Sequence, residues 1–439
     1  MNKSFGPGSC PLRGTVHVPG DKSLSHRAVL FSAMARGVSH VSGVLDSADV
    51  RSTIEAVRAL GARVDLSVSP DGSLAGAIEG WGASGPVAPA SPIDCGNSGT
   101  TARLLMGMLA GWPIVVTLTG DSSLSLRPMR RVTDPLSEMG ANFLTTDSGT
   151  LPVTVQGSAT LRPLSYHSPV ASAQVKTALL LAGIRAIGGV RVVEPAPSRD
   201  HTERLLPAYG IPVTVDAQEF SASLCGPVVP MATDVDVPRD PSSAAFLVSA
   251  AVLIPDSEVV LPGVSLNQTR VGFLHVLERM GAQIEVVDPN VEGNEPVATI
   301  VAHHTKQLRA TLVTEGEVPS LVDEVPVLAL VAALAQGTTR FEGVGELRVK
   351  ESDRLAAVAD GLTALGVTVR TGGDWLEVDG PSELGAQTLD SLHDHRLAMV
   401  WALAGLVGVG RVKVSDYEAV DVSYPRFADD LAALADGAQ

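Results

Sequence analysis

The chain has 439 residues, of which 45% are hydrophobic and 18% charged, so it has enough apolar surface for a packed core, and intrinsic disorder is excluded. Its 32 Lys and Arg residues against 48 Asp and Glu residues give a formal charge of −16, which disfavours nucleic acid and anionic membranes as partners. Because one hydrophobic core stops growing at about 300 residues, we expect two domains.

The cysteines and the apolar segments favour a cytoplasmic protein. Cys10, Cys95 and Cys225 form no CxxC pair, so we expect neither a disulfide framework nor a structural zinc site. Residues 1–14 lack the pattern of a secretory signal. The longest apolar run, 397–410, is shorter than the roughly 20 residues that span a bilayer.

Six copies of one pattern follow each other along the chain, each predicting the order strand, helix, strand, helix, strand, strand. The first helix of each copy is apolar on most faces and is expected to be buried, at 23–35, 100–110, 173–186, 242–253, 322–335 and 396–407. The second helix is expected to end at a glycine, which takes the left-handed conformation at little cost. These glycines are Gly61, Gly140, Gly210, Gly281, Gly366 and Gly437.

Two similar segments divide the six copies into two groups of three. Residues 16–23 (VHVPGDKS) resemble residues 235–242 (VDVPRDPS), and each is a strand that leads into a buried helix. If the second half completes the first strand, the chain crosses between domains twice. We therefore expect one lobe at 21–237 and a second lobe formed by 1–20 with 238–439.

Helix starts in the first half carry groups that could bind anions. Lys22, Ser23 and Arg27 lie at the first of them, where Ser23 could cap the helix and exposed backbone N–H groups favour an anion. The other candidates in this half are Gly99, Arg103, Arg127, Ser172, Gln174, Lys176, Ser198 and Arg199. Each start could equally be an ordinary capped helix with solvated charges. Cys95 has no histidine partner nearby in the sequence and is expected to be structural.

Helix starts in the second half mix acidic and basic residues. Asp323 and Glu324 open one of the most apolar helices, so at least one of them should be partly buried. Lys350 and Arg354, four residues apart, could clamp an anion beside Glu351. The alternative is a solvated helix start of mixed charge.

Metal and dinucleotide motifs are not found. His393 and His395 have no third ligand at a suitable spacing, so we expect the neighbouring Arg396 to bind an anion. No GxGxxG motif has an acidic residue about twenty positions further on, as a dinucleotide site would require.

The motifs PGDKSLSHR, GNSGTTARLL, RPM, ASAQVKTALLLAG, RVKESDR and HDHRLAM together resemble those of the 5-enolpyruvylshikimate-3-phosphate synthase family of enolpyruvyl transferases. The resemblance covers nearly the whole chain in the family's order. It implies an α/β fold, an inside-out barrel of two similar domains, each with three βαβαββ units whose buried helices point their N-termini at an active site in the interdomain cleft.

The resemblance also implies a reaction. Phosphoenolpyruvate would donate its carboxyvinyl group to the 5-hydroxyl of shikimate 3-phosphate and release phosphate, through a tetrahedral ketal. This step belongs to the shikimate pathway of aromatic amino-acid biosynthesis and needs no metal or organic cofactor. We expect a cytoplasmic monomer whose partners are these two small molecules.

The resemblance also implies the site residues, which are assigned here from the matching motifs. Shikimate 3-phosphate would be held by Lys22, Ser23, Arg27, Ser172, Gln174, Ser198, Asp323 and Lys350. Phosphoenolpyruvate would be held by Lys22, Gly99, Arg127, Gln174, Arg354 and Arg396. Asp323 is expected to be the base toward the 5-hydroxyl, while Lys22 and Glu351 handle the methylene and leaving-phosphate protons, in either assignment.

Three positions bear on how closely the family pattern is followed. Ala173 stands where some members have Ser. Val422 stands where many members have a Lys, and whether Lys413 replaces it is open. Gly99 is retained, which in this family leaves room for glyphosate, so we expect sensitivity to that inhibitor.

Two alternatives compete with this interpretation. A related enolpyruvyl transferase acting on a UDP-amino sugar would be expected to show Lys-Asn instead of Lys22-Ser23 and a reactive Cys in an Arg-rich loop. A non-catalytic anion-binding protein on the same repeats would gain nothing from Asp323 and Glu351 among its cations.

Overall fold

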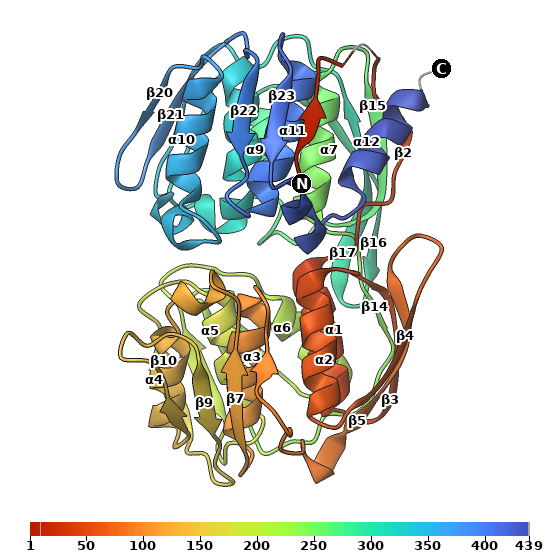
Figure 1. Cartoon of the computed structure of the whole chain (residues 1–439). Coiled ribbons are helices and arrows are strands. Elements are labelled where there is room, and N and C mark those ends of the chain that lie inside the picture. The colour runs from red at the N-terminus through yellow and green to blue at the C-terminus, as the bar shows by residue number, and fades with distance from the viewer. Residues whose placement is uncertain (9, 438–439) are drawn as a thin grey trace. The chain divides into compact units, whose positions relative to one another are not determined.

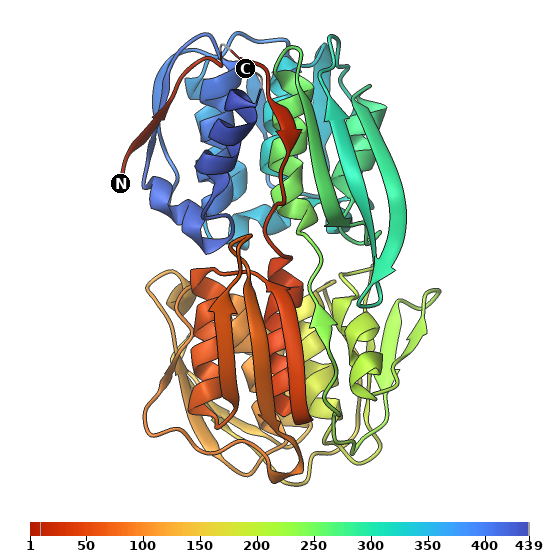
Figure 2. The ribbon, with the colours of Figure 1, turned by 90° about the vertical axis from the view of Figure 1, so that its right-hand side faces the viewer.

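A computed structural model describes residues 1–8 and 10–437, which form two compact units (Figures 1 and 2). The N-terminal unit comprises Gly20–Pro238 and Glu292–Glu295. The C-terminal unit comprises Met1–Pro19, Arg239–Val291 and the chain from Pro296 onward. The expected lobes differ from these units at Gly20, at Pro238 and at the turn 292–295, which all belong to the N-terminal unit.

The described part of the N-terminal unit contains three four-stranded sheets. In each sheet the first two strands are parallel and the other neighbours are antiparallel. In sheet order the strands are β14 (Val235–Asp236), β3 (Arg36–Val44), β5 (Leu74–Trp81) and β4 (Arg63–Val68); β6 (Ile93–Asp94), β7 (Val115–Thr119), β9 (Val153–Gln156) and β8 (Asn142–Leu144); β10 (Leu164–His167), β11 (Val190–Val193), β13 (Ser221–Leu224) and β12 (Thr214–Asp216).

The described C-terminal unit repeats this design, with one sheet reduced to three strands. In sheet order the strands are β16 (Gln283–Glu292), β17 (Glu295–His303), β15 (Glu258–Ser265) and β2 (Arg13–Thr15); β18 (Leu312–Val313), β19 (Gly337–Phe341), β21 (Leu376–Gly380) and β20 (Val369–Thr371); β1 (Lys3–Phe5), β23 (Val412–Ser415) and β22 (Gln387–Asp390). The parallel pair recurs in β2 with β15, β18 with β19 and β22 with β23.

β2 and β14 lie at equivalent positions in the two units. β2 precedes the first buried helix of the N-terminal unit in sequence, yet it pairs with β15, with Glu258 opposite Arg13. β14 precedes the first buried helix of the C-terminal unit, yet it pairs with β3, with Val235 opposite Val41. The C-terminal unit therefore takes in a strand that precedes the N-terminal unit in sequence, while β14 is the last strand of the N-terminal unit along the chain.

Inner and outer helices alternate along the chain, as the repeats predicted. The inner helices are α1 (Lys22–Met34), α3 (Gly99–Ala110), α5 (Ala173–Gly183), α7 (Pro241–Leu253), α9 (Val325–Leu334) and α11 (His395–Val407). The outer helices are α2 (Ala48–Ala59), α4 (Arg130–Glu138), α6 (His201–Leu205), α8 (Gly272–Arg279), α10 (Arg354–Ala364) and α12 (Phe427–Asp436). Short 3₁₀ turns are η1 (Gly82–Ser84), η2 (Leu124–Leu126), η3 (Leu206–Tyr209), η4 (Val318–Ser320), η5 (Val322–Glu324), η6 (Gly345–Val349) and η7 (Tyr417–Val422). The predicted α/β class with buried helices is confirmed.

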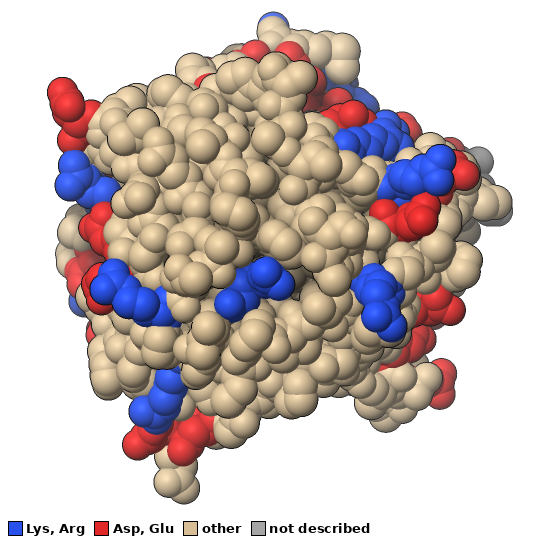
Figure 3. All heavy atoms as spheres, turned by 90° about the horizontal axis from the view of Figure 1, so that it is seen from below, with Lys and Arg blue, Asp and Glu red and all other residues tan. Residues whose placement is uncertain are grey.

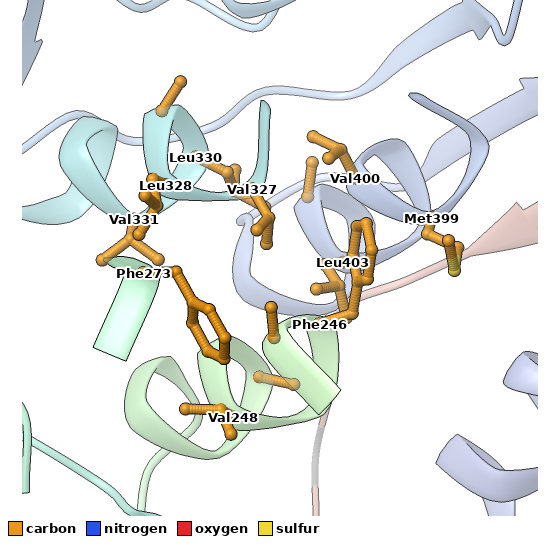
Figure 4. Packing of buried hydrophobic residues seen from close by; sticks show 14 of the residues in the cluster. Phe246, Val248, Phe273, Val327, Leu328, Leu330, Val331, Met399, Val400 and Leu403 are labelled. Carbon is orange, nitrogen blue, oxygen red and sulfur yellow. The ribbon is translucent and has the colours of Figure 1, made fainter. Parts of the chain in front are cut away.

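The inner helices are buried because they carry apolar side chains on all faces. Nine of the ten residues of α9, from Val325 to Ala333, are buried. Figure 4 shows how Phe246 of α7, Val327 of α9 and Leu403 of α11 approach one another in the core of the C-terminal unit. Burying each such side chain stabilises the fold by about 1.5–3 kcal/mol, so this contact holds the three inner helices together.

At five of the six predicted positions a glycine in the left-handed conformation follows the outer helix, or, for Gly210, the 3₁₀ turn η3 that continues α6. Gly61, Gly140, Gly210, Gly281 and Gly366 have positive φ angles between 75° and 107°, which side chains with a Cβ disfavour. Gly437 is the exception, since it ends α12 with a φ of −65°. The left-handed conformation predicted for Gly437 is therefore wrong, and this helix end does not require glycine for its backbone angles.

The turn between β16 and β17 packs within the N-terminal unit. Glu295 Oε1 lies 2.7 Å from His201 Nδ1, and both side chains are buried. The amide of Asn294 donates to the carbonyl of Arg204 at 3.2 Å. This hairpin thus leads the chain out of one unit and back again.

Among the described residues, none of the helices is both long and apolar enough to traverse a bilayer.

Figure 3, a view from below Figure 1, shows a face whose middle carries few charged side chains, while most Lys, Arg, Asp and Glu side chains lie toward its edge.

Candidate functional site

The start of α1 presents Lys22 and Ser23 in its first turn. Asp21 caps this helix, because its side chain accepts from the Leu24 N–H at 2.8 Å. The prediction that Ser23 caps the helix is wrong, since Ser23 lies inside α1. Lys22 Nζ lies 2.5 Å from Asp49 Oδ2 at the start of α2, and this carboxylate orients the ammonium group.

Arg27 extends from α1 into the interior of the N-terminal unit. Its guanidinium donates to Thr202 Oγ1 at 2.8 Å, to Thr177 Oγ1 at 2.9 Å and to the Ser23 carbonyl at 2.9 Å. Burial lowers the pKa of Arg27 to about 10, although Glu203 and Asp21 oppose the shift. Arg27 therefore stays cationic at neutral pH, in a fixed orientation.

The starts of α3 and α5 bring Gly99, Arg127 and Gln174 into one cluster, which also contains Arg103. Gln174 Oε1 accepts from Arg103 Nη1 at 2.5 Å, and Gln174 Nε2 donates to Thr100 Oγ1 at 2.9 Å. A Cβ on Gly99 would lie 3.0 Å from Arg103 Nη1 and 3.5 Å from Arg127 Nη1. Two guanidinium groups thus lie against backbone that has no side chain, at a helix N-terminus that itself favours anions.

Ser172 and Ser198 meet through a third residue, Glu194. Ser172 caps α5, and its N–H donates to Glu194 Oε1 at 2.7 Å. The Ser198 hydroxyl donates to Glu194 Oε2 at 2.7 Å. The structure therefore brings the two predicted serines to one carboxylate, although they are far apart in sequence.

Arg354 is the centre of the predicted cluster in the C-terminal unit. Its guanidinium is 1% exposed and donates to Asp394 Oδ2 at 2.7 Å, to Asp323 Oδ1 at 3.1 Å and to Glu351 Oε2 at 2.5 Å. Burial lowers the pKa of Arg354, but the carboxylates of Asp394, Glu351 and Asp323 outweigh it, so the pKa is raised overall. Arg354 is therefore a permanent buried cation held by three acids.

Asp323 and Glu324 are both buried, as was expected of at least one. Asp323 Oδ2 lies 3.6 Å from Arg396 Nη2, and its Oδ1 lies 3.9 Å from Lys350 Nζ. Glu324 Oε1 accepts from Arg396 Nη1 at 3.3 Å. The structure thus brings together Asp323, Lys350, Glu351, Arg354 and Arg396.

Four supporting acids or polar residues were not predicted as part of the site. They are Asp49 beside Lys22, Glu194 between the serines, Asp394 beside Arg354, and Ser242, which donates to Glu324 Oε1 at 2.5 Å. Asp394 had a signal, because an Asp before an apolar helix is a typical N-cap, and it does cap α11. Glu194 had none, since nothing in the sequence links it to Ser172.

The residues weighed for other roles are placed as follows. Cys95 is buried, and burial raises the pKa of its thiol to about 12, so it is structural at neutral pH. Lys413 is exposed on β23, while Val422 lies in η7. Over the described residues, no group of three His, Cys, Asp or Glu side chains could hold a metal ion.

Each unit thus holds buried or half-buried cations at the starts of inner and outer helices, with acids that orient them. Such an arrangement is suited to binding small anions, because fixed cations and helix N-termini stabilise phosphate and carboxylate groups. Asp323 and Glu351 add groups that could move protons.

The fold is that of the enolpyruvyl transferases. The enolpyruvyl transferase NikO from Streptomyces tendae matches with a TM-score of 0.77 at 20% identity, over 99% of this chain and 97% of NikO. An EPSP synthase from Acinetobacter baumannii matches with a TM-score of 0.87 at 40% identity, over 99% of this chain and 98% of that one.

The family model for EPSP synthase (3-phosphoshikimate 1-carboxyvinyltransferase) matches residues 7–431, and the chain belongs to this family. A 3-phosphoshikimate 1-carboxyvinyltransferase of Rhodospirillum rubrum is 46% identical, covering 97% of this chain and 95% of that protein. One from Halorhodospira halophila is 47% identical, covering 100% of this chain and 97% of that protein. The predicted resemblance is confirmed.

Proposed function

We propose that this chain transfers the carboxyvinyl group of phosphoenolpyruvate to the 5-hydroxyl of shikimate 3-phosphate and releases phosphate. The proposal depends on the match to the EPSP synthase family model over residues 7–431. It is supported by relatives named 3-phosphoshikimate 1-carboxyvinyltransferase, which are 46–47% identical over nearly the whole chain. The reaction is a step of the shikimate pathway of aromatic amino-acid biosynthesis.

The proposed ligands of shikimate 3-phosphate are Lys22, Ser23, Arg27, Ser172, Gln174, Ser198, Asp323 and Lys350. Those of phosphoenolpyruvate are Lys22, Gly99, Arg127, Gln174, Arg354 and Arg396. The two substrates carry about six negative charges near neutral pH, since a phosphate monoester has a second pKa of about 6. The cations of these sets provide the opposite charge, which supports the assignment.

The chemistry requires four proton movements: from the 5-hydroxyl, to the methylene carbon, from the methyl group and to the leaving phosphate. We assign Asp323 as the base toward the 5-hydroxyl, because its carboxylate lies within 3.9 Å of three cations that would also hold the substrate anions. As the hydroxyl oxygen attacks the substituted alkene carbon, the methylene carbon takes a proton, and a tetrahedral ketal forms. Loss of a methyl proton and of phosphate then restores the double bond. Lys22 and Glu351 handle the protons of the methylene and of the leaving phosphate.

The transfer is tested by following phosphate release from the purified chain. We expect release only when shikimate 3-phosphate and phosphoenolpyruvate are both present. Release that needs only one of them would indicate a phosphatase, and no release at all would also remove the assignment.

The addition–elimination route is tested in D₂O. A methylene carbon that passes through a methyl group takes up solvent hydrogen, so we expect deuterium in the vinyl group of the product by NMR. A product vinyl group free of deuterium would contradict the proposed ketal.

The alternative acting on a UDP-amino sugar is not favoured, because the relatives named above are 3-phosphoshikimate 1-carboxyvinyltransferases. The further proposals are that the chain is a cytoplasmic monomer and needs no metal or organic cofactor. Sedimentation at micromolar concentration should give the mass of one chain, and a dimer would contradict this.

A further inference from the structure

Glu194 is a buried carboxylate just beyond β11 with three hydrogen-bonding partners. Its side chain is 2% exposed. Oε1 accepts from the backbone N–H of Ser172, while Oε2 accepts from the hydroxyl of Ser198 at 2.7 Å and lies 2.8 Å from Lys176 Nζ. One carboxylate therefore engages both serines of the proposed phosphate site.

Lys176 balances this carboxylate together with Glu203. Its ammonium lies 2.7 Å from Glu203 Oε1, and its side chain is 6% exposed. Burial lowers the pKa of Lys176, but Glu203 and Glu194 outweigh it and raise the pKa overall. Among the described residues, Glu203 Oε2 is buried and accepts no hydrogen bond, so it offers Lys176 a further acceptor.

The hydroxyl of Ser198 has a single hydrogen to donate. In the structure that hydrogen goes to Glu194. A phosphate dianion offers only acceptor oxygens, so it can bond to Ser198 only by taking the same hydrogen. Glu194 and the phosphate cannot both have it.

We propose that Glu194 competes with the substrate phosphate for the hydroxyl hydrogen of Ser198 and thereby sets the affinity for the phosphorylated substrate. The inference rests on the proposed function, because it takes Ser198 as a phosphate ligand. When the hydroxyl turns to the phosphate, Glu194 keeps the Ser172 N–H and Lys176. The exchange therefore leaves no buried carboxylate oxygen unpaired, and each binding event trades one charge-assisted hydrogen bond for another.

The test is a double-mutant cycle on the binding of shikimate 3-phosphate, measured by calorimetry. In Glu194→Gln, the amide oxygen can still accept from the Ser172 N–H, and the amide nitrogen donates to Ser198, which leaves the serine hydrogen for the phosphate. Lys176 can turn to Glu203 Oε2. We expect binding about threefold to tenfold tighter, the range for the net strength of one ordinary hydrogen bond, because one bond is exchanged for another.

Ser198→Ala removes the serine hydroxyl and keeps the charge of Glu194, so it measures the contribution of the hydroxyl alone. In the wild-type background it should weaken binding less than about threefold, because one bond replaces another of similar strength. In the Glu194→Gln background it should abolish most of the gained affinity. Because Ser198→Ala alone tests the exchange, the inference stays falsifiable if Glu194→Gln does not fold.

Glu203→Gln is the matched control, since it removes a charge from the other side of Lys176 without contacting either serine. An equal gain in Glu203→Gln, unchanged or weaker binding in folded Glu194→Gln, or a large loss in Ser198→Ala alone would overturn the inference. If the wild-type chain does not bind shikimate 3-phosphate at all, the proposed function fails instead.

Discussion

At the residue scale, the chemistry depends on carboxylates that lie among cations. Asp323 divides its two oxygens among Lys350, Arg354 and Arg396. Arg354 in turn has Asp394 and Glu351 as further partners. Asp323 can therefore be altered while Arg354 keeps two acids, which makes a test of its role as a base feasible.

Asp323→Asn should lower kcat roughly 10² to 10⁴-fold, the contribution of one positioned proton-transfer group. The amide still accepts hydrogen bonds, so binding of shikimate 3-phosphate should change far less than kcat. Steady-state kinetics and calorimetry measure the two effects. Asp353→Asn is the control, because Asp353 caps α10 and pairs with Arg348 outside the proposed ligand set; its kcat should match that of the wild type. A kcat in Asp323→Asn within threefold of that control would contradict the role.

Gly99→Ala should raise the KM for phosphoenolpyruvate and weaken inhibition by glyphosate. The added Cβ would lie 3.0 Å from Arg103 Nη1, so the Arg103 guanidinium must shift by a few tenths of an ångström, and it would lie in ordinary contact with Arg127 Nη1 at 3.5 Å. Inhibition curves at fixed shikimate 3-phosphate measure the change. Unaltered inhibition, or a wild-type turnover unaffected by a large excess of glyphosate, would show that the inhibitor does not bind against Gly99.

His26 makes the N-terminal unit sensitive to acid. Burial, Lys22 and Arg27 lower the pKa of His26 well below its ordinary 6.5, while its Nδ1 lies 2.7 Å from Thr53 Oγ1. Below pH 6.5 the unfolded chain takes a proton that the folded chain refuses, so the free energy of unfolding falls as the pH falls. The slope is about 1.4 kcal/mol per pH unit.

Urea unfolding at about pH 7 and about pH 5.5 tests this slope. His26→Gln should lose less stability on acidification than the wild type does, while the exposed His17→Gln should behave like the wild type. An equal loss in all three proteins would contradict the assignment of acid sensitivity to His26.

At the scale of elements, close packing between an outer and an inner helix limits substitution. Gly361 on α10 faces Trp401 of α11, and a Cβ there would lie 2.4 Å from two atoms of the indole ring. Helix propensity favours Ala over Gly by about 1 kcal/mol, but inserting a group into a packed core costs about 1–3 kcal/mol and more where backbone is involved. The steric cost should prevail.

Gly361→Ala should therefore lower the free energy of unfolding by up to about 2 kcal/mol in urea titrations. Asp360 lies directly before Gly361 in α10 and is exposed. Asp360→Ala should therefore leave the free energy of unfolding unchanged or raise it slightly. A Gly361→Ala protein more stable than the wild type would show that α10 can move away from α11.

Helices were predictable from the sequence because apolar runs and helix-ending glycines are local signals. The predicted helix at 242–253 corresponds to α7 at Pro241–Leu253, and that at 396–407 to α11 at His395–Val407. The start of α9 was harder to place, because Val322–Glu324 forms the 3₁₀ turn η5. Pairings between distant segments carry no local signal: Lys3 pairs with Val414, and His201 contacts Glu295.

The same distinction holds for the site. Cations at helix starts were predictable from their position, and Arg354 and Arg396 do share Asp323. Glu194 was not predictable, because its role depends on Ser172, which is 22 positions away and approaches it only in the folded chain.

At the scale of the whole molecule, an acidic chain can still bind anions. The formal charge of −16 acts over about 8 Å at physiological salt, whereas buried guanidinium groups act at contact. Both units carry such cations, Arg27 in one and Arg354 in the other. The central claim is that these cations, with the helix starts beside them, bind the phosphate and carboxylate groups of the two proposed substrates.

A crystal structure with shikimate 3-phosphate and glyphosate bound tests this claim most directly. We predict the phosphate of the first ligand on Arg27, Ser172 and Ser198, and glyphosate against Gly99, Arg127, Arg354 and Arg396. Ligands that bind away from these side chains would contradict the account.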